Sequence, residues 1–355
     1  GSDITLTGTL TATDDITLTA DDLITGVGLI TGDLLTATAG NGISINTNIN
    51  TLTATTTDSN ISLTEQDGLA LNDVNAGTGD VTLTLLAGAL NSNTGTGITG
   101  NDLVVNGVDA VDINTNVDTL TVTTNNADIT VTEGDGIALN LIDAGTGNVD
   151  IQLTDGAITD NNGNDLNIIG TNLILSAETG IGSGDALETA VTNLSAMVTS
   201  GAATGNIEIV NTGDLTLGNL AGWGDAVRNY GSGDITITVN SNLTIEDPVA
   251  SNGGDITLTA NSGAIEQGAA GDITTLGGHY MATAAGPYIM ADGAVVNTGA
   301  GIIDIEAGGD IVVGQLISTA TAYLESGGAI VDGGDTGGAD IQATAAELIA
   351  ENGIG

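Results

Sequence analysis

The chain has 355 residues, with 45 acidic side chains against a single arginine, Arg228, and no lysine, so its formal net charge is −44. Such a surface repels nucleic acid, which excludes nucleic-acid binding. The chain lacks cysteine and has one histidine, His279, which leaves one candidate base for His-dependent catalysis and excludes metal sites built from several His and Cys ligands. No run of eighteen apolar residues occurs, so no transmembrane helix is expected.

Short runs of alternating aliphatic and threonine residues predict strands along the chain. Examples are residues 15–19, 80–84, 234–238 and 255–259. Ile, Val and Thr favour extended backbone, and a period of two is typical of a half-buried strand. Clusters of Gly, Asn and Asp between the runs predict bends.

A Gly-Asp pair, or a close variant, precedes many of these runs about every twenty residues. In the second half its aspartates are Asp214, Asp234, Asp255, Asp272 and Asp310, giving steps of 20, 21, 17 and 38, the last equal to two steps of 19. A strand with bends at this spacing, and no helical pattern between, predicts one coil of a parallel β-solenoid per roughly 20 residues.

A longer repeat is superimposed on the coil. The segment that begins at Ile45 returns from Ile113 at a constant offset of 68 residues. We expect one continuous solenoid over 1–355, with sub-repeats near 43–110, 111–184 and 185–222, an irregular aromatic-bearing region at 223–290 and final coils at 291–355. Because 350–355 resembles 177–182, after which the chain runs on into another repeat, we expect a slice of a longer chain.

The composition indicates a core of thin aliphatic layers. Hydrophobic residues make up 40% of the chain, yet aromatic residues only 1%, and phenylalanine is absent. At about 4.8 Å per coil the rod would be roughly 85 Å long, with about one negative charge per 2 Å, close to the line density of duplex DNA. Such a rod is expected to hold a cation atmosphere and to associate laterally only when cations or a basic partner screen it.

Unusual side chains gather between residues 223 and 290. Aromatic residues and arginine are enriched where proteins meet partners, so this region is a candidate contact patch. An equally good alternative is an irregular coil whose widened core accepts larger residues. The candidate patch residues are Trp223, Arg228, Tyr230, His279, Tyr280 and Tyr288. A lone histidine beside a tyrosine is expected to be structural.

Oxygen-rich bends are candidate calcium ligands. They lie at 14–15, 21–22, 101–102 and 332–335. None matches an EF-hand loop, so we expect diffuse or weakly bound cations, with Ca²⁺ possible and no required cofactor. The paired acids Glu246 and Asp247 could serve a glycosidase, but they lie beside Pro248 in a predicted turn.

Threonine ladders of the Thr-x-Thr type can bind ice when they stay in register on consecutive coils. Thr236 and Thr238 are in step with Thr257 and Thr259. The next coils are expected to carry 274–275 and then 312–313, which are Thr-Thr and Val-Val. The ladder is therefore expected to break, and a short ladder that stabilises the surface is the favoured interpretation.

The runs at 15–20 and 255–260, with the stretches at 187–196 and 211–217, resemble the very large secreted β-solenoid proteins of bacteria, the filamentous-haemagglutinin-like exoproteins and giant β-strand-repeat surface proteins. The resemblance covers essentially the whole chain and carries no catalytic motif. It implies a right-handed parallel β-helix, export across the outer membrane, and a role as an adhesin or extracellular fibre. The near absence of basic residues departs from haemagglutinin-like proteins and favours a matrix, sheath or filament role.

These observations predict a structural extracellular protein that is not an enzyme. Self-association into a filament or layer and binding of cations are expected. The alternative is a surface adhesin with a discrete receptor patch, which could recognise cell-surface glycans. A polysaccharide-active β-helix enzyme is a remote alternative, since such enzymes combine carboxylates with Arg, Lys or His and this chain has one arginine.

Overall fold

The computed structural model describes residues 1–93, 97–334 and 338–355. These residues form an all-β parallel β-solenoid of about 16 turns, with about 21 residues per turn. The predicted fold class and coil length are therefore confirmed. The described residues contain no helix, and hence none long and apolar enough to cross a membrane. Contacts divide the chain into two compact units, residues 1–155 with 167–170 and residues 156–166 with 171–355.

The first unit contains three long strands among shorter ones, and its strands pair in parallel with those of the next coil. The pairing of β4 with β5 extends from Leu23–Gly42 to Ala39–Thr56. The strands are β1 (Ile4–Leu6), β2 (Leu10–Thr11), β3 (Ile16–Ala20), β4 (Leu23–Ala39), β5 (Gly42–Thr56), β6 (Ile61–Glu65), β7 (Leu69–Asn75), β8 (Val81–Leu85), β9 (Leu90–Ser92), β10 (Ile98–Asn106), β11 (Val111–Thr123), β12 (Ile129–Glu133), β13 (Ile137–Asp143), β14 (Val149–Leu153) and β16 (Ile168–Ile169).

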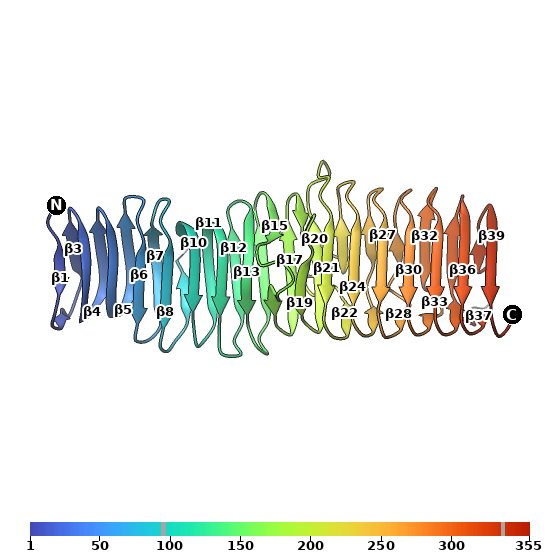
Figure 1. Cartoon of the computed structure of the whole chain (residues 1–355), viewed down its shortest axis with the longest axis horizontal. Helices are drawn as coiled ribbons and strands as arrows, with labels where there is room; N and C mark the ends of the chain where they lie inside the picture. Colours follow the sequence, from blue (N-terminus) through green and yellow to red (C-terminus); the bar gives the residue numbers. More distant parts are fainter. Residues whose placement is uncertain (94–96, 335–337) are drawn as a thin grey trace. The chain divides into compact units, whose positions relative to one another are not determined.

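The second unit has shorter strands, three per coil, that form three parallel ladders (Figure 1). The first ladder comprises β21 (Ile207–Asn211), β24 (Ile235–Val239), β27 (Ile256–Ala260), β30 (Tyr280–Ala284), β33 (Ile303–Ala307), β36 (Thr321–Ser326) and β39 (Ala345–Ala350). The second comprises β22 (Leu215–Leu217), β25 (Leu243–Ile245), β28 (Ile265–Gln267), β31 (Tyr288–Met290), β34 (Ile311–Val313) and β37 (Ile330–Asp332). The third comprises β20 (Asn193–Val198), β23 (Val227–Asn229), β26 (Val249–Ser251), β29 (Ile273–Thr274), β32 (Val295–Gly299), β35 (Gln315–Ser318) and β38 (Ile341–Gln342). This unit also contains β15 (Ala157–Asp160), β17 (Asn172–Ala177), β18 (Gly180–Ile181) and β19 (Leu187–Ala190).

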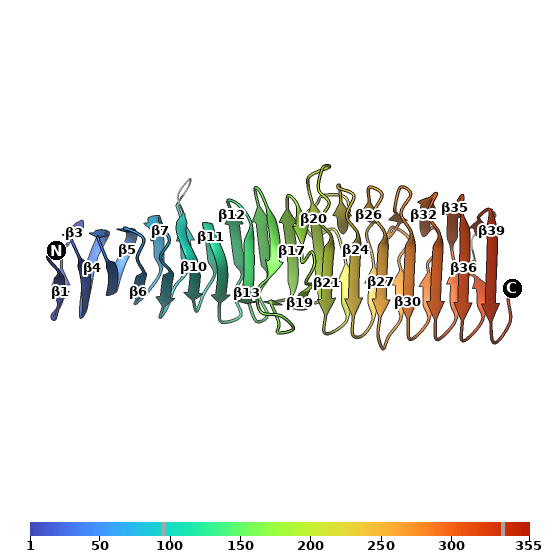
Figure 2. The same cartoon turned by 45° about the horizontal axis from the view of Figure 1, so that its top comes forward.

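Alternating burial along each strand builds the core. In β24, Ile235, Ile237 and Val239 are buried, while Thr236 and Thr238 face outward. The same inward positions stack from coil to coil, and Figure 2 shows β24, β27 and β30 side by side. Burial of one such aliphatic side chain contributes on the order of 1.5–3 kcal/mol, so a narrow core that is repeated many times can hold the fold.

The Gly-Asp pair meets two requirements of stacking, as Gly254 and Asp255 at the start of β27 illustrate. A Cβ atom on Gly254 would overlap the carbonyl oxygen of Gly233 in the neighbouring coil, so only glycine fits. The Asp255 N–H donates to Asp234 Oδ1 at 2.8 Å, and Asp255 Oδ1 accepts the His279 N–H at 2.7 Å. A side-chain oxygen thus satisfies the backbone donor of each next coil at this corner.

The same acceptor is used at the other two corners of the second unit. Asp214 Oδ1 accepts the Asn242 N–H at 3.0 Å ahead of the second ladder. Asp272 Oδ1 accepts the Val295 N–H at 3.0 Å ahead of the third. At each of the three corners a backbone N–H of the next coil needs a side-chain acceptor, so aspartate recurs at all three.

This corrects the coil-by-coil interpretation of the Gly-Asp spacing. Among the predicted steps, only the one from Asp234 to Asp255 joins equivalent corners of adjacent coils. Asp214 and Asp310 precede strands of the second ladder and Asp272 precedes a strand of the third. The average spacing gave the correct coil length, although most individual steps connect different corners.

Replacing Asp255 tests the side-chain acceptor. Asp255→Ala leaves the His279 N–H without its partner, so we expect the free energy of unfolding to fall by about 1 kcal/mol. Asp255→Asn keeps Oδ1 and removes a charge stacked on Asp234, so its stability should stay close to that of the wild type. Urea unfolding followed by circular dichroism measures both. Equal losses in the two variants would show that the charge, and not the acceptor, stabilises this corner.

Candidate functional site

Tyr280 and Tyr288 lie in the core, so the prediction that they belong to a contact patch is wrong. Both are fully buried, and their hydroxyls lie 2.9 Å apart. Tyr288 also donates to Gln267 Oε1 at 3.1 Å. Burial raises the pKa of both phenols, which therefore stay neutral. Ala282 and Ala284 occupy the other inward positions of β30, and their small side chains offset the volume of the Tyr280 ring.

His279 occupies a corner position equivalent to that of a Gly-Asp aspartate. Its side chain is exposed, and its Nδ1 accepts the N–H of Ile302 from the following coil at 2.9 Å. Its own N–H donates to Asp255. The histidine is thus a corner acceptor, in agreement with the structural role expected from the sequence.

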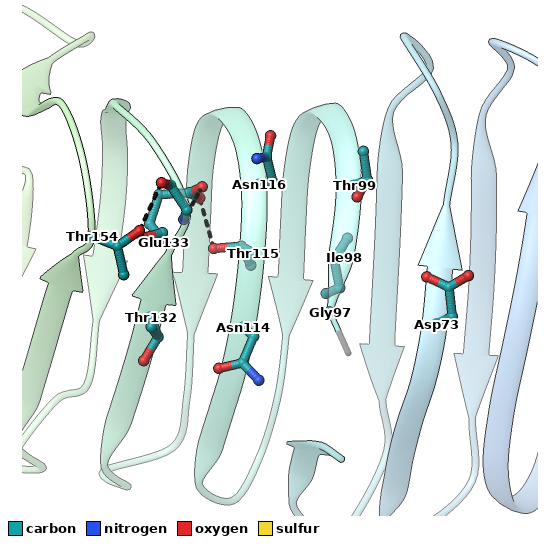
Figure 3. Close-up of a pocket in the computed structure, with 11 residues that line it drawn as sticks. Asp73, Gly97, Ile98, Thr99, Asn114, Thr115, Asn116, Thr132, Glu133 and Thr154 are labelled. Carbon is teal, nitrogen blue, oxygen red and sulfur yellow. Dashed lines mark hydrogen bonds between the residues drawn. The ribbon is translucent and has the colours of Figure 1, made fainter. Parts of the chain in front are cut away.

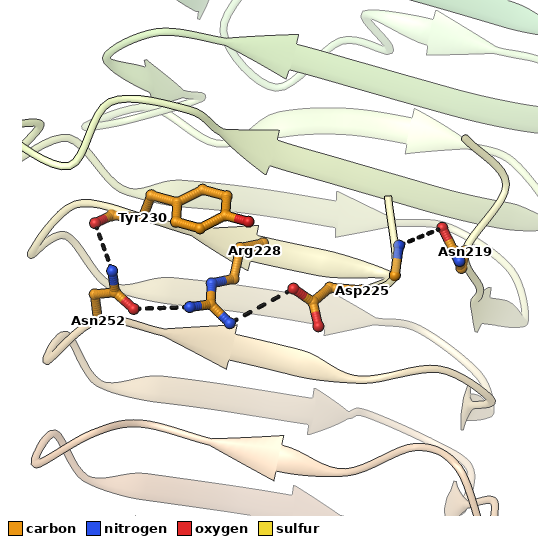
Figure 4. Close-up of polar contacts among 6 residues, drawn as sticks. Asn219, Asp225, Arg228, Tyr230 and Asn252 are labelled. Carbon is orange, nitrogen blue, oxygen red and sulfur yellow. Dashed lines mark hydrogen bonds and ion pairs between the residues drawn. The ribbon is translucent and has the colours of Figure 1, made fainter. Parts of the chain in front are cut away.

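Arg228 and Tyr230 do lie together at the surface, in a group that we call the Arg228 cluster and that consists of Asp225, Arg228, Tyr230 and Asn252 (Figure 4). The guanidinium lies 4.7 Å from the centroid of the Tyr230 ring. Its Nη2 donates to Asn252 Oδ1 at 2.9 Å, and the Asn252 amide donates to the Tyr230 carbonyl at 2.9 Å. The only arginine of the chain is therefore fixed against an aromatic ring that is 38% exposed.

The ion pair within this cluster is weak. Arg228 Nη1 lies 3.5 Å from Asp225 Oδ2, and each side chain is 21% exposed. Burial raises the pKa of Asp225, and the Arg228 charge offsets only part of this rise. Arg228 Nε is buried and has no hydrogen-bond partner among the described residues. Pairs of this kind contribute at most about 1 kcal/mol, so the cluster positions a cation more than it stabilises the fold.

Trp223 is half-buried in the turn between β22 and β23. Within the described part of the chain, no hydrogen bond, ion pair or ring contact joins it to Arg228 or Tyr230. Of the six predicted patch residues, the structure therefore brings Arg228 and Tyr230 together, places Trp223 in the turn that precedes β23, and assigns the other three to corner and core positions.

An open pocket of about 740 Å³ lies in the first unit and was not predicted (Figure 3). Its lining is made mainly of hydroxyl, amide and carboxyl side chains, including Asp73, Thr99, Asn114 and Thr132. The most buried of these groups is Glu133, at the end of β12, which is fully shielded from solvent. No aromatic side chain lines the pocket among the described residues.

Glu133 holds the turn that follows its strand. Its carboxylate accepts the Thr115 hydroxyl at 2.7 Å, the Gly134 N–H at 2.7 Å and the Asp135 N–H at 3.3 Å. It also accepts the Val117 N–H of the preceding coil at 3.4 Å. Desolvation by burial raises the pKa of Glu133 to about 7, and these hydrogen bonds limit the rise.

The same arrangement occurs 68 residues earlier. Glu65 is fully buried at the end of β6 and accepts the Gln66 N–H at 2.8 Å and the Ile49 N–H at 3.3 Å. Burial raises its pKa as well. Register shifts accompany both copies, between Leu52 and Thr53 and between residues 120 and 121. Glu65 and Glu133 make equivalent hydrogen bonds in the two copies of the repeat. We therefore infer that both glutamates stabilise the turns that follow their strands.

The oxygen-rich bends are engaged in hydrogen bonds between and within coils. Asp102 Oδ1 accepts the Thr119 hydroxyl at 2.6 Å, and Asp332 Oδ1 accepts the Gly334 N–H at 2.7 Å. Asp335 of the same bend lies outside the described residues. Across residues 1–93, 97–334 and 338–355, no group of three His, Cys, Asp or Glu side chains is arranged to hold a metal ion.

Comparison with known proteins identifies no relative: no family model, no curated protein and no solved structure matches the chain. The parallel β-solenoid that the resemblance to filamentous-haemagglutinin-like exoproteins implied is confirmed by the fold. Membership of that family stays a prediction.

The buried glutamates are the feature that sequence reasoning missed. Ile61, Leu63 and Glu65 alternate in β6, so the pattern itself points the glutamate inward. Its copy at Glu133 has the same phase. A charged residue at an inward position of a repeated strand was therefore the signal that could have identified this corner.

Glu133 should make stability depend on pH. Its pKa is about 7 in the folded chain against 4.5 as the ordinary value, so the folded state binds the proton more tightly. The resulting stability is fully present below pH 4.5 and is lost as pH rises through 7. We compare the free energy of unfolding of Glu133→Gln with that of the wild type. Because only the wild type loses the stabilising proton, we expect this difference to shift in favour of the variant by on the order of 2 kcal/mol from pH 5.5 to pH 8.5. Urea unfolding at both pH values measures this difference, and a constant difference would show that Glu133 is ionised throughout.

Proposed function

We propose that this chain is a structural segment of an extracellular fibre, sheath or matrix whose acidic faces associate through cations. The observation that carries the proposal is the stacking of outward carboxylates on consecutive coils. Glu306 of β33 is opposite Glu325 of β36, and both are exposed. Asp304 and Glu347 take the positions on either side of Tyr323 in the neighbouring file.

Stacked charges of one sign oppose both folding and lateral contact. Equivalent side chains of adjacent coils are separated by roughly 4.8 Å, and two unit charges at about 4 Å repel by about 1 kcal/mol in water and by more near a protein surface. Only Arg228 supplies a fixed side-chain cation within the sequence. Mobile cations must therefore neutralise these files before two such surfaces can meet.

The interior suits a mechanical role. Each coil contributes parallel backbone hydrogen bonds to both neighbours and buries an aliphatic layer. Extension along the stacking direction has to break these bonds together with the layer beneath them. A resistant segment with a highly charged exterior is what a fibre or matrix requires.

Titration with divalent cations tests this proposal. At low ionic strength, Ca²⁺ or Mg²⁺ should raise the melting temperature and increase light scattering, because it neutralises stacked carboxylates. NaCl at matched ionic strength should act more weakly, and about 0.15 M NaCl should reduce the divalent effect because the Debye length is then only ~8 Å. A Glu306→Gln, Glu325→Gln variant should respond less. Absence of any cation dependence at low ionic strength would contradict the proposal.

The Arg228 cluster favours a second candidate, a surface adhesin that recognises a receptor through this cluster. An exposed tyrosine beside a fixed arginine is a common combination at binding surfaces. Glycan receptors fit this chemistry, since a sugar can stack on the ring and accept hydrogen bonds from the guanidinium.

Tyrosine replacement separates the adhesin from the fibre. Tyr230→Ala should lower the binding of the purified chain to cells or to immobilised glycans, because it removes the exposed ring. Tyr323→Ala is the matched control, since Tyr323 is 39% exposed and Tyr230 38%. Flow cytometry with labelled protein measures the binding. Equal binding by the wild type and both variants would contradict the proposal that the Arg228 cluster binds a receptor.

A further inference from the structure

A complete threonine array occurs in the first unit, where the sequence did not suggest one. Thr17, Thr36 and Thr53 form one file, and Thr19, Thr38 and Thr55 form the second. These pairs lie on β3, β4 and β5, on three consecutive coils, and the register is unbroken between them. We call these six residues the threonine array.

The ladder considered from the sequence is different. Thr236 and Thr257 are in register, as are Thr238 and Thr259, as expected. The next coil places Met281 and Thr283 in these files, not residues 274–275, which belong to the third ladder. The coil after that contributes an aspartate and a glutamate, at 304 and 306. That ladder is interrupted after two rungs, whereas the array in the first unit has three.

The hydroxyls of the array are available to a ligand. All six side chains face outward and are exposed or half-buried. Within the described part of the chain their hydroxyls make no hydrogen bond. Other threonines differ in this respect, because Thr115 donates to Glu133 and Thr124 donates to the Ala127 carbonyl.

The array is also free of charge. None of its positions is acidic in a chain that has 45 acidic residues. The next coil ends it, because the register shifts after Leu52 and Asp73 and Asn75 take the two files. A neutral surface in this setting matches a neutral partner, since any ionic partner would find stronger complementarity elsewhere on the chain.

The geometry indicates a partner that repeats in two directions. Equivalent residues of adjacent coils are about 4.8 Å apart, and residues two apart along a strand are about 6.6 Å apart. Threonine is β-branched and restricted at χ1, so the hydroxyl and methyl groups are held in place before binding. A rigid grid of hydroxyls complements a crystal lattice better than it complements a single flexible molecule.

We propose that the threonine array binds ice, with its hydroxyls hydrogen-bonded to water molecules that continue into the lattice. A neutral crystalline polysaccharide repeats as well, but sugars are usually held by stacking on aromatic rings, and no array position is aromatic. Ice offers hydrogen-bond donors and acceptors at regular intervals and requires no ring. This activity is independent of the proposed fibre role.

Partition into growing ice tests the proposal. The whole chain, labelled at its N-terminal amine, should enter a slowly grown ice hemisphere in excess over an inert protein of similar size. Thr36→Glu with Thr38→Glu places two charges in the middle rung and should abolish the enrichment. Thr82→Glu with Thr84→Glu is the matched control, because these residues form an outward Thr-x-Thr pair on β8 that lies outside the array. This control should retain the wild-type enrichment.

A second variant guards against misfolding. Thr36→Val with Thr38→Val keeps shape and β-propensity and removes only the hydroxyls, so it should lose the enrichment while its circular dichroism spectrum stays unchanged. Exclusion of the wild type from ice would overturn the proposal, as would full enrichment of the valine variant. Retention on crystalline cellulose in place of ice would also overturn it and would assign the array to a polysaccharide. None of these results bears on the cation dependence of the fibre.

Discussion

The register of a parallel ladder is the constraint on which the rest of this protein depends. Each residue lies against its counterpart in the next coil, so whatever a position contains is stacked on the same position again. Gly254 must be glycine because Gly233 is beneath it, and Asp255 can accept a backbone N–H because Asp234 does the same one coil earlier. The repeated dipeptide is the result of this geometry and not a sign of chemistry.

The same register creates the electrostatic problem of the fold. A hydrogen bond to a carboxylate is worth about 1.5–3 kcal/mol, and repulsion between neighbouring carboxylates costs about 1–4 kcal/mol depending on how well water screens them. The two effects are of similar size, so the aspartate corners are tolerable and not strongly stabilising. Asn242 and His279 show that a side chain other than a carboxylate can act as the acceptor in the same position.

The sequence was sufficient for the fold, because alternation and turn residues repeat in every coil. It was not sufficient to assign each strand to one of the three ladders. All three corners have a backbone N–H that needs an acceptor, so the same dipeptide occurs at each of them. The buried tyrosines were misjudged because rare residues near one another suggested a surface. The alternation of Tyr280, Ala282 and Ala284 already placed Tyr280 inward. The Arg228 cluster depends on contacts across 24 residues, between Arg228 and Asn252, that no local pattern reveals.

The single arginine has a consequence for how proteases can act on the chain. Proteases of the trypsin type cleave after lysine or arginine, and within these 355 residues the bond after Arg228 is their only target. That bond lies inside β23, which is paired on one side with β20 and on the other with β26. A protease must bind its substrate as an extended, unpaired segment, so it would have to open two neighbouring coils first. The near absence of basic residues, which makes the surface acidic, thus also makes the folded chain resistant to proteases of the trypsin type.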